Sequence, residues 1–345
     1  MKAMILAAGL GTRLRPLTDN RPKALVEIAG RPLLEITLSR LRSSGVTEVI
    51  INVHHFADMV IDYLKSKKNF GMRIEISREE ALLDTGGGLK KAAWFFLDDS
   101  SSGKSSLLDE PFLLHNVDVI SNIDLRRMVQ FHKENHALAT LAVQDRETSR
   151  YLLFNDQLQL CGRRSSSTAT PVHPELRRGC APQIQATQNP SGTASPLAQQ
   201  VSSPVIPNEV RDLLLPREGT ASVHPEARRT VPKSAENLGV RQGTASAVPK
   251  SVEQSGVLTP EVPLQALAFS GIHVISPRLL PMLTEDAVFS IIDAYLRLAA
   301  QGEKILAFRA DEYYWRDLGR PSDLAQAAHD LKQKGLVSPQ SADPS

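Results

Sequence analysis

The chain has 345 residues, of which 41% are apolar and 23% charged, and its formal net charge at pH 7 is +2. This composition is that of an ordinary globular protein, long enough for one large α/β domain or two smaller ones. The small net charge argues against a nucleic-acid or membrane partner, and no apolar run approaches the roughly 20 residues of a membrane-spanning helix. The two cysteines, Cys161 and Cys180, have neither metal-ligand spacing nor the density of a disulfide scaffold. A cytoplasmic location is therefore expected.

The first 25 residues predict a buried strand that leads into a phosphate-binding loop. Met4 to Ala7 are apolar, and Gly9 and Gly11 follow them. These glycines permit positive φ angles and a close approach of a ligand to the backbone. Successive backbone amides in such a loop form a concavity for anions, and Arg13 and Lys23 add cations. The pattern favours a site for a polyphosphate.

Other glycine-rich loops fit this segment less well. A Walker-type loop needs its lysine directly after the second glycine, whereas Lys23 lies twelve residues past Gly11. A dinucleotide-binding fingerprint needs a third small residue where this chain has Leu14, and an acidic residue where the second apolar run ends in Asn52.

The next segments alternate between helix and strand. Leucines at helical spacing predict a helix between Pro32 and Gly45, and Glu48–Asn52 reads as a strand. A second amphipathic helix is expected over residues 56–64, followed by a strand at Arg73–Ser77. This alternation indicates a parallel sheet with helices on both faces.

A glycine run, Asp84–Gly88, precedes an expected helix that carries Trp94, Phe95 and Phe96. Its structural interpretation is a flexible turn in which Asp84 or Thr85 caps the helix. Its functional interpretation is a bare backbone that lies against a flat nucleobase. The family resemblance described below favours the second interpretation.

A fourth strand, Phe112–His115, ends in Asn116, Val117 and Asp118. A carboxylate at the end of an α/β strand points into the crevice where ligands bind, and Mg²⁺ is usually held by one or two carboxylates plus substrate phosphates. Asp124 is more simply explained as the N-cap of the following helix.

The composition changes after an expected fifth strand (139–143) and a hairpin (150–161). From Arg163 to Pro260 there is no Phe, Tyr or Trp, yet 12 of the 22 prolines fall there. The stretch also repeats itself, since VHPELRR at 172–178 recurs as VHPEARR at 223–229. Such a segment has too few large apolar groups to offset its ordering entropy. We predict one domain formed by residues 1–162 and 263–331, a disordered, internally repetitive insertion at 163–262, and a flexible tail at 332–345.

Order is expected to resume with a strand at Gln265–Ser276, in which Gly271 marks a close approach. A helix capped by Ser290, a strand at Ile305–Arg309 and a terminal helix at 321–331 follow. Between the last two lies Trp315–Gly319, which includes Asp317.

The stretch LAAGLGTRLRPLT followed by RPKALVEIAGRPLLE resembles the signature of the sugar-1-phosphate nucleotidyltransferases. The nearest branches are the N-acetylmuramate-1-phosphate uridylyltransferase-like and the mannose- or heptose-1-phosphate guanylyltransferase-like enzymes. The resemblance implies a Rossmann-like three-layer α/β sandwich with a mostly parallel central sheet, of the GT-A-like nucleotidyltransferase type. The chain departs from the family pattern at Ala24, where proline is usual, and at Val117, where glycine is usual. A β-branched residue does not take φ > 0 cheaply, so the turn must differ or the site is weakened.

The resemblance also implies a function and a set of site residues. The function is Mg²⁺-dependent transfer of a nucleotidyl group from an NTP, UTP or GTP, to a sugar 1-phosphate in nucleotide-sugar biosynthesis for cell-envelope polysaccharide. By position, Arg13, Lys23 and Asp118 would be catalytic, and Asp118 and Asp317 would bind Mg²⁺. The implied nucleotide-binding residues are Leu6, Ala7, Ala8, Gly9, Gly11, Thr12, Arg13, Lys23, Gly86, Gly87 and Asn116, and the implied sugar-phosphate-binding residues are Asn116, Gly162 and Gly271. Two alternatives stay open, a non-catalytic regulatory homologue that binds nucleotide or sugar, and a dinucleotide-dependent oxidoreductase.

Overall fold

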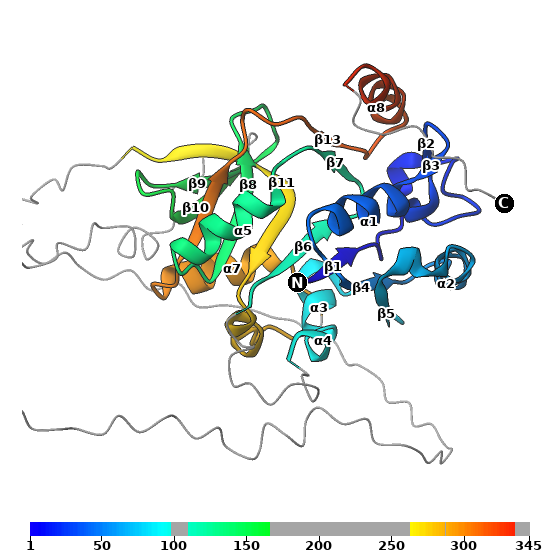
Figure 1. The fold of residues 1–345 in the computed structure, drawn as a ribbon. Coiled ribbons are helices and arrows are strands. Elements are labelled where there is room, and N and C mark those ends of the chain that lie inside the picture. Colours follow the sequence, from blue (N-terminus) through cyan, green and yellow to red (C-terminus); the bar gives the residue numbers. More distant parts are fainter. Residues whose placement is uncertain (98–109, 166–262, 287, 335–345) are drawn as a thin grey trace, which may run out of the picture. The chain divides into compact units, whose positions relative to one another are not determined.

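The structure is a computed structural model that describes residues 1–97, 110–165, 263–286 and 288–334, all of them within one compact unit of the chain. It has the α/β architecture that the sequence predicts (Figure 1). Among the described residues, no helix is both long enough and apolar enough to cross a membrane.

The central sheet is mixed. Its N-terminal strands β1 (Lys2–Leu6), β4 (Glu48–Val53), β5 (Arg73–Arg78) and β6 (Phe112–Asn116) are parallel, with β1 between β4 and β6. Strand β11 (Gln265–Ile275) runs antiparallel to β6, β8 (Ala139–Gln144) and β9 (Arg150–Phe154). Two further strands extend the sheet, β10 (Leu160–Ser165) beside β9 and β12 (Ile305–Arg309) beside β8. Strand β11, which follows the insertion in sequence, therefore lies at the centre of the sheet.

Helices cover both faces of this sheet, because alternate residues of its buried strands point to opposite sides. Ala3 and Ile5 of β1 pack in a core with α1 (Leu33–Ser43), α2 (Ala57–Ser66), α5 (Leu125–Glu134) and α8 (Pro321–Lys334). Met4, between them, packs in a second core with α3 (Asp84–Lys91), α4 (Trp94–Leu97) and α7 (Ile291–Ala300). The two cores give the predicted three-layer arrangement.

Short elements complete the fold. The 3-10 helices η1 (Thr12–Leu14) and η2 (Lys23–Leu25) follow β1, and the small hairpin β2 (Glu27–Ile28) and β3 (Arg31–Pro32) leads to α1. Strand β7 (Val119–Ser121) pairs with β13 (Trp315–Asp317) in a separate antiparallel ribbon. The described residues also form two further 3-10 helices, η3 (Lys68–Gly71) and η6 (Pro277–Met282).

Several local predictions are confirmed. The hairpin of β9 and β10 turns at Asn155, whose Oδ1 accepts hydrogen bonds from the amides of Gln157 and Gln159. Asp124 caps α5 by accepting from two amides of its first turn, and Ser290 caps α7.

Other local predictions need correction. The run Asp84–Gly88 is not a flexible turn, because α3 begins at Asp84, and neither Asp84 nor Thr85 caps that helix. Strand β10 extends to Ser165, three residues past the predicted boundary of the insertion, and α8 continues to Lys334. Residues 166–262, which contain the repeats and Cys180, lie outside the described residues.

Candidate functional site

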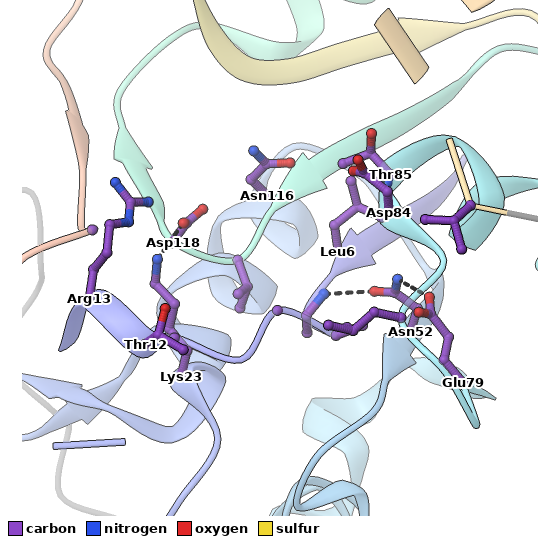
Figure 2. A pocket seen from close by; sticks show the side chains of 18 residues that line it. Leu6, Thr12, Arg13, Lys23, Asn52, Glu79, Asp84, Thr85, Asn116 and Asp118 are labelled. Atoms are coloured by element: carbon purple, nitrogen blue, oxygen red, sulfur yellow. Dashed lines mark hydrogen bonds and ion pairs between the residues drawn. The ribbon is translucent and has the colours of Figure 1, made fainter. Parts of the chain in front are cut away.

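A cavity of about 510 Å³ opens at the carboxyl ends of β1, β4 and β6 (Figure 2). Leu6, Asn52 and Asn116 come from the ends of these three parallel strands, which meet at one edge of the sheet. This edge is where open α/β sheets bind ligands. The described residues that line the cavity are Leu6, Ala7, Ala8, Gly9, Gly11, Thr12, Arg13, Lys23, Asn52, Glu79, Leu82, Asp84, Thr85, Asn116, Val117, Asp118, Val288 and Gly319.

The loop after β1 is closed by a glycine that no other residue could replace without strain. Gly11 has φ 65°, and a Cβ there would lie 3.0 Å from Cγ2 of Thr18 and 3.2 Å from Cβ of Lys23. Thr18 Oγ1 donates a 2.9 Å hydrogen bond to the Gly11 carbonyl. The loop thus folds tightly enough to bring Thr12, Arg13 and Lys23 to one end of the cavity.

A charged cluster occupies this end. The Lys23 ammonium group, on a residue only 8% exposed, pairs with the Asp118 carboxylate. Strand β13 places Asp317 opposite Val119, and the Leu318 amide donates a 2.9 Å hydrogen bond to the Asp118 carbonyl. The two aspartates, almost 200 residues apart in sequence, are therefore neighbours.

The charges within this cluster act on one another. Burial, followed by the negative charge of Asp118, raises the pKa of the Asp317 carboxyl, while Lys23 and Arg13 lower it. Two close carboxylates repel each other unless a cation lies between or beside them. Lys23 and Arg13 supply such positive charge in this cluster, and the two aspartate carboxylates are also donors of the kind that Mg²⁺ takes.

Arg13 also lies beside this cluster. A Cβ on Gly319 would lie 2.9 Å from the Arg13 guanidinium carbon, so glycine at this position allows the guanidinium group to pack against the backbone. Figure 2 shows Arg13, Lys23 and Asp118 together at one end of the cavity.

The cavity wall also contains a buried polar pair, Asn52 and Glu79, that the sequence does not predict. Asn52 Oδ1 accepts from the Ala7 amide at 2.7 Å, and Asn52 Nδ2 donates to Glu79 Oε1 at 2.7 Å. Glu79 Oε2 accepts from the Leu83 amide at 3.1 Å. The pair thus ties the start of the loop after β1 to the segment that leads into α3. The sequence does contain a signal for Asn52, because it is a polar residue near the end of an apolar parallel strand.

The glycine run contributes differently from the prediction. The Gly86 and Gly87 amides donate to the Phe289 carbonyl, at 2.9 and 3.3 Å, and both glycines are buried in the first turns of α3. The described residues that line the cavity include Asp84 and Thr85 but not these two glycines. The structure gives Gly86 a packing role, because its Cβ would lie 2.2 Å from the Phe289 ring.

The residues predicted to bind the sugar phosphate are only partly brought together. Asn116 lines the cavity, and Gly271, with φ 74°, lies against it, since a Cβ there would be 3.0 Å from Asn116 Nδ2. Gly162 lies in β10 beside an irregularity in its pairing with β9 and is not among the described lining residues. Val117 is buried and does not have a positive φ. The turn at this position therefore differs from one that needs glycine, which is the first of the two outcomes predicted for valine here.

The chain is similar to known proteins in part of its sequence and in its fold. Residues 2–153 match the family described as nucleotidyl transferase. The chain is 53% identical over 93 residues to N-acetylmuramate alpha-1-phosphate uridylyltransferase of Caulobacter vibrioides, a match that covers 26% of this chain and 38% of that protein. It is 39% identical over 153 residues to mannose-1-phosphate guanyltransferase beta-B of Xenopus laevis, which covers 44% of this chain and 40% of that protein. The matches thus span about two fifths of the length of these curated relatives.

The fold is also that of a solved structure. UDP-glucose pyrophosphorylase complexed with UDP-glucose superposes with a TM-score of 0.57 at 15% identity, over 96% of this chain and 98% of that one. At this low identity the likeness establishes the fold alone.

Proposed function

We propose that the chain transfers a nucleotidyl group from an NTP to a sugar 1-phosphate, because residues 2–153 match the nucleotidyl transferase family. The products would be an NDP-sugar and pyrophosphate. The observation that carries this proposal is the meeting of Arg13, Lys23, Asp118 and Asp317 beside a glycine-turned loop. UTP and GTP are the preferred candidates, because the two relatives named above are a uridylyltransferase and a guanyltransferase.

The reaction needs positioning and charge neutralisation more than it needs proton transfer. An oxygen of the sugar phosphate attacks the α-phosphorus, the bond from that phosphorus to the bridging oxygen breaks, and pyrophosphate leaves with the electron pair. The nucleophile is already an anion, so no general base is required. Phosphoryl transfer of this kind depends on in-line geometry and on cations near the oxygens that gain charge.

The chain supplies those groups from its own backbone and side chains. In this proposal the amides from Gly9 to Thr12, together with Arg13, hold the β- and γ-phosphates at the end of the cavity. Lys23 contacts the α-phosphate, and its burial beside Asp118 fixes the ammonium group in the cavity wall. Removing one such preorganised donor typically costs ~3–4 kcal/mol of activation free energy.

Two carboxylates suit Mg²⁺ here, Asp118 in the lining of the cavity and Asp317 beside it, outside the described lining residues. Among the described residues there is no group of three or more His, Cys, Asp or Glu side chains that would enclose a metal. Asp118 and Asp317 are two carboxylates, the number that Mg²⁺ commonly takes from a protein when substrate phosphates complete its shell. When bound, Mg²⁺ would supply Lewis-acid polarisation and a template for the phosphates.

The test is pyrophosphate release, measured for each of the four NTPs with a panel of sugar 1-phosphates. We expect release with a defined NTP and sugar phosphate, and a loss of roughly 10²–10³ in kcat for Lys23→Ala. Lys90→Ala is the matched control, because Lys90 is exposed and hydrogen-bonds a backbone carbonyl outside the cavity. Nucleotide binding without any release would instead favour the non-catalytic homologue, and full activity of Lys23→Ala would remove Lys23 from the mechanism.

A further inference from the structure

The strand that carries Asp317 lies outside the central sheet. Strand β13 pairs with β7 in a short antiparallel ribbon, with Asp317 opposite Val119. A two-stranded ribbon by itself is marginally stable at best. Side-chain contacts between β13 and the central sheet must therefore help to set where Asp317 lies.

Trp315 supplies one such contact. It lies two residues before Asp317, so both side chains lie on the same face of the strand. Its indole Nε1 donates a 2.7 Å hydrogen bond to the Ser270 carbonyl of β11. Ser270 lies where the pairing of β11 with β8 is irregular, between Phe269 and His273. An interrupted ladder leaves backbone groups free for other partners, and here one of them holds the indole.

Arg146 packs on the face of this indole. Its guanidinium carbon lies 3.7 Å from the centroid of the Trp315 ring, and its Nη2 donates a 2.8 Å hydrogen bond to the Phe269 carbonyl. A guanidinium group can stack on an aromatic ring and donate in its own plane at the same time, which an ammonium group cannot do. The Trp315 ring is therefore held at its edge by β11 and on its face by Arg146.

The surroundings of Arg146 suit a positioning role better than a binding role. It is not among the described residues that line the cavity, and no carboxylate of the described part of the chain lies within ion-pair distance of it. Burial lowers the pKa of Arg146, and the negative charge of Asp317 opposes that change. The two charged groups therefore attract each other, while the direct contacts of Arg146 are with the indole ring and the backbone of β11.

We propose that Arg146 is a positioning residue, which clamps Trp315 against β11 and thereby holds the Asp317 carboxylate beside Asp118. The inference rests on the proposed function, since it concerns the placement of a carboxylate assigned to Mg²⁺ there. The clamp joins the chain on either side of residues 166–262, because Arg146 precedes β9 and Trp315 follows β12. A misplacement of about 1 Å in an active site can lower a rate about 100-fold, so loss of the clamp should be visible in turnover.

The first readout is the kinetics of Arg146→Gln, which removes both the stack and the charge. We expect kcat to fall roughly 10- to 100-fold and the Mg²⁺ concentration for half-maximal rate to rise. The KM values for NTP and sugar 1-phosphate should stay within about 2-fold, because Arg146 does not line the cavity. Arg73→Gln is the matched control, since the Arg73 guanidinium lies over the Phe95 ring at the amino end of β5, away from the cavity. It should leave kcat and the Mg²⁺ dependence unchanged.

Two further variants test whether Arg146 acts through the indole. Arg146→Lys keeps the charge but not the planar group, so it should lose nearly as much activity as Arg146→Gln. Trp315→Leu should lower kcat by a similar factor, and Arg146→Gln in the same chain should lower it little further, because the clamp is already lost. Losses that multiply in the double variant would overturn the proposal. Full activity of Arg146→Lys would do the same, because charge alone would then suffice.

Fluorescence gives a readout that does not depend on turnover. The chain has two tryptophans, Trp94 and Trp315, so Trp94→Phe leaves Trp315 as the only one. In this background Arg146→Gln should increase the quenching of Trp315 by acrylamide, because one face of the indole is uncovered, whereas Arg73→Gln should not. Unchanged quenching would overturn the proposal, as would increased quenching with unchanged kcat. If the unmodified protein released no pyrophosphate with any NTP, the proposed function would fail, and quenching would still decide whether Arg146 holds Trp315.

Discussion

Replacing Asn52 by Asp should destabilise the protein, and replacing Glu79 by Gln in the same chain should restore it. Asn52 accepts from the Ala7 amide and donates to Glu79, which accepts from the Leu83 amide. In Asn52→Asp the new carboxylate still accepts from Ala7, but it faces the Glu79 carboxylate. In Glu79→Gln the new side-chain NH₂ group must face either the Asn52 NH₂ group or the Leu83 amide, so two donors oppose each other in both orientations of the Gln side chain.

The magnitude follows from the burial of the pair, since Asn52 and Glu79 are each 3% exposed. Losing a hydrogen bond to a buried carboxylate costs about 1.5–3 kcal/mol, and the like charge in Asn52→Asp adds to this. We expect each single variant to lose about 2–4 kcal/mol of unfolding free energy. In the double variant the repulsion between two carboxylates is absent, because the Gln amide donates to the new carboxylate and the Gln carbonyl accepts from Leu83.

Urea unfolding of the two single variants and the double variant forms a double-mutant cycle. We expect a double variant within about 1 kcal/mol of the unmodified protein, and therefore a coupling free energy of about 3–8 kcal/mol, which is the sum of the two single losses less the loss in the double variant. Asn155→Asp is the control, because Asn155 is a buried asparagine that accepts from two backbone amides in the β9–β10 hairpin. It should change stability little. Additive losses in the double variant would refute the assigned hydrogen-bond directions.

Three further outcomes follow from the structure. Asp317→Asn should lower kcat roughly 100-fold and raise the Mg²⁺ concentration needed for half-maximal rate, and an unchanged metal titration would exclude Asp317 as a ligand. Gly86→Ala should lower the unfolding free energy by about 1–3 kcal/mol because its Cβ meets the Phe289 ring, and urea unfolding checks this. Burial, then Arg278 and Lys133, lowers the pKa of His132 from 6.5 to about 4. The unfolded state therefore binds more protons between these two values, and stability should fall as the pH is lowered through that window, with a loss of about 2 kcal/mol at pH 5. Because burial lowers the pKa values of His115 and His273 in the same direction, His132→Asn should reduce the slope of this pH dependence without removing it, and an unchanged slope would exclude His132.

The N-terminal part of the fold could be predicted because its signals are local. Apolar strands alternate with helices of clear periodicity from β1 to β5, and each predicted element is present within a few residues. The position of β11 at the centre of the sheet could not be predicted in this way. Its pairing with β6 joins segments more than 140 residues apart, and no periodicity encodes such a register.

The site shows the same division between local and long-range signals. The cationic loop and the strand-end aspartates are recognisable in short motifs, and the structure brings Arg13, Lys23, Asp118 and Asp317 together. The conformation of the glycine run could not be predicted because it depends on Phe289, about 200 residues later, whose carbonyl accepts the Gly86 and Gly87 amides. Propensity alone disfavours glycine in a helix, and here a tertiary contact outweighs it.

The central place of β11 has a consequence for how the protein is made on the ribosome. Residues 1–165 can emerge early and assemble β1, β4, β5 and β6, but β6 and β9 each keep an open edge until β11 has been synthesised. Exposed strand edges invite pairing with other chains. The newly made N-terminal part must therefore wait, through the synthesis of some hundred residues, for the strand that closes it.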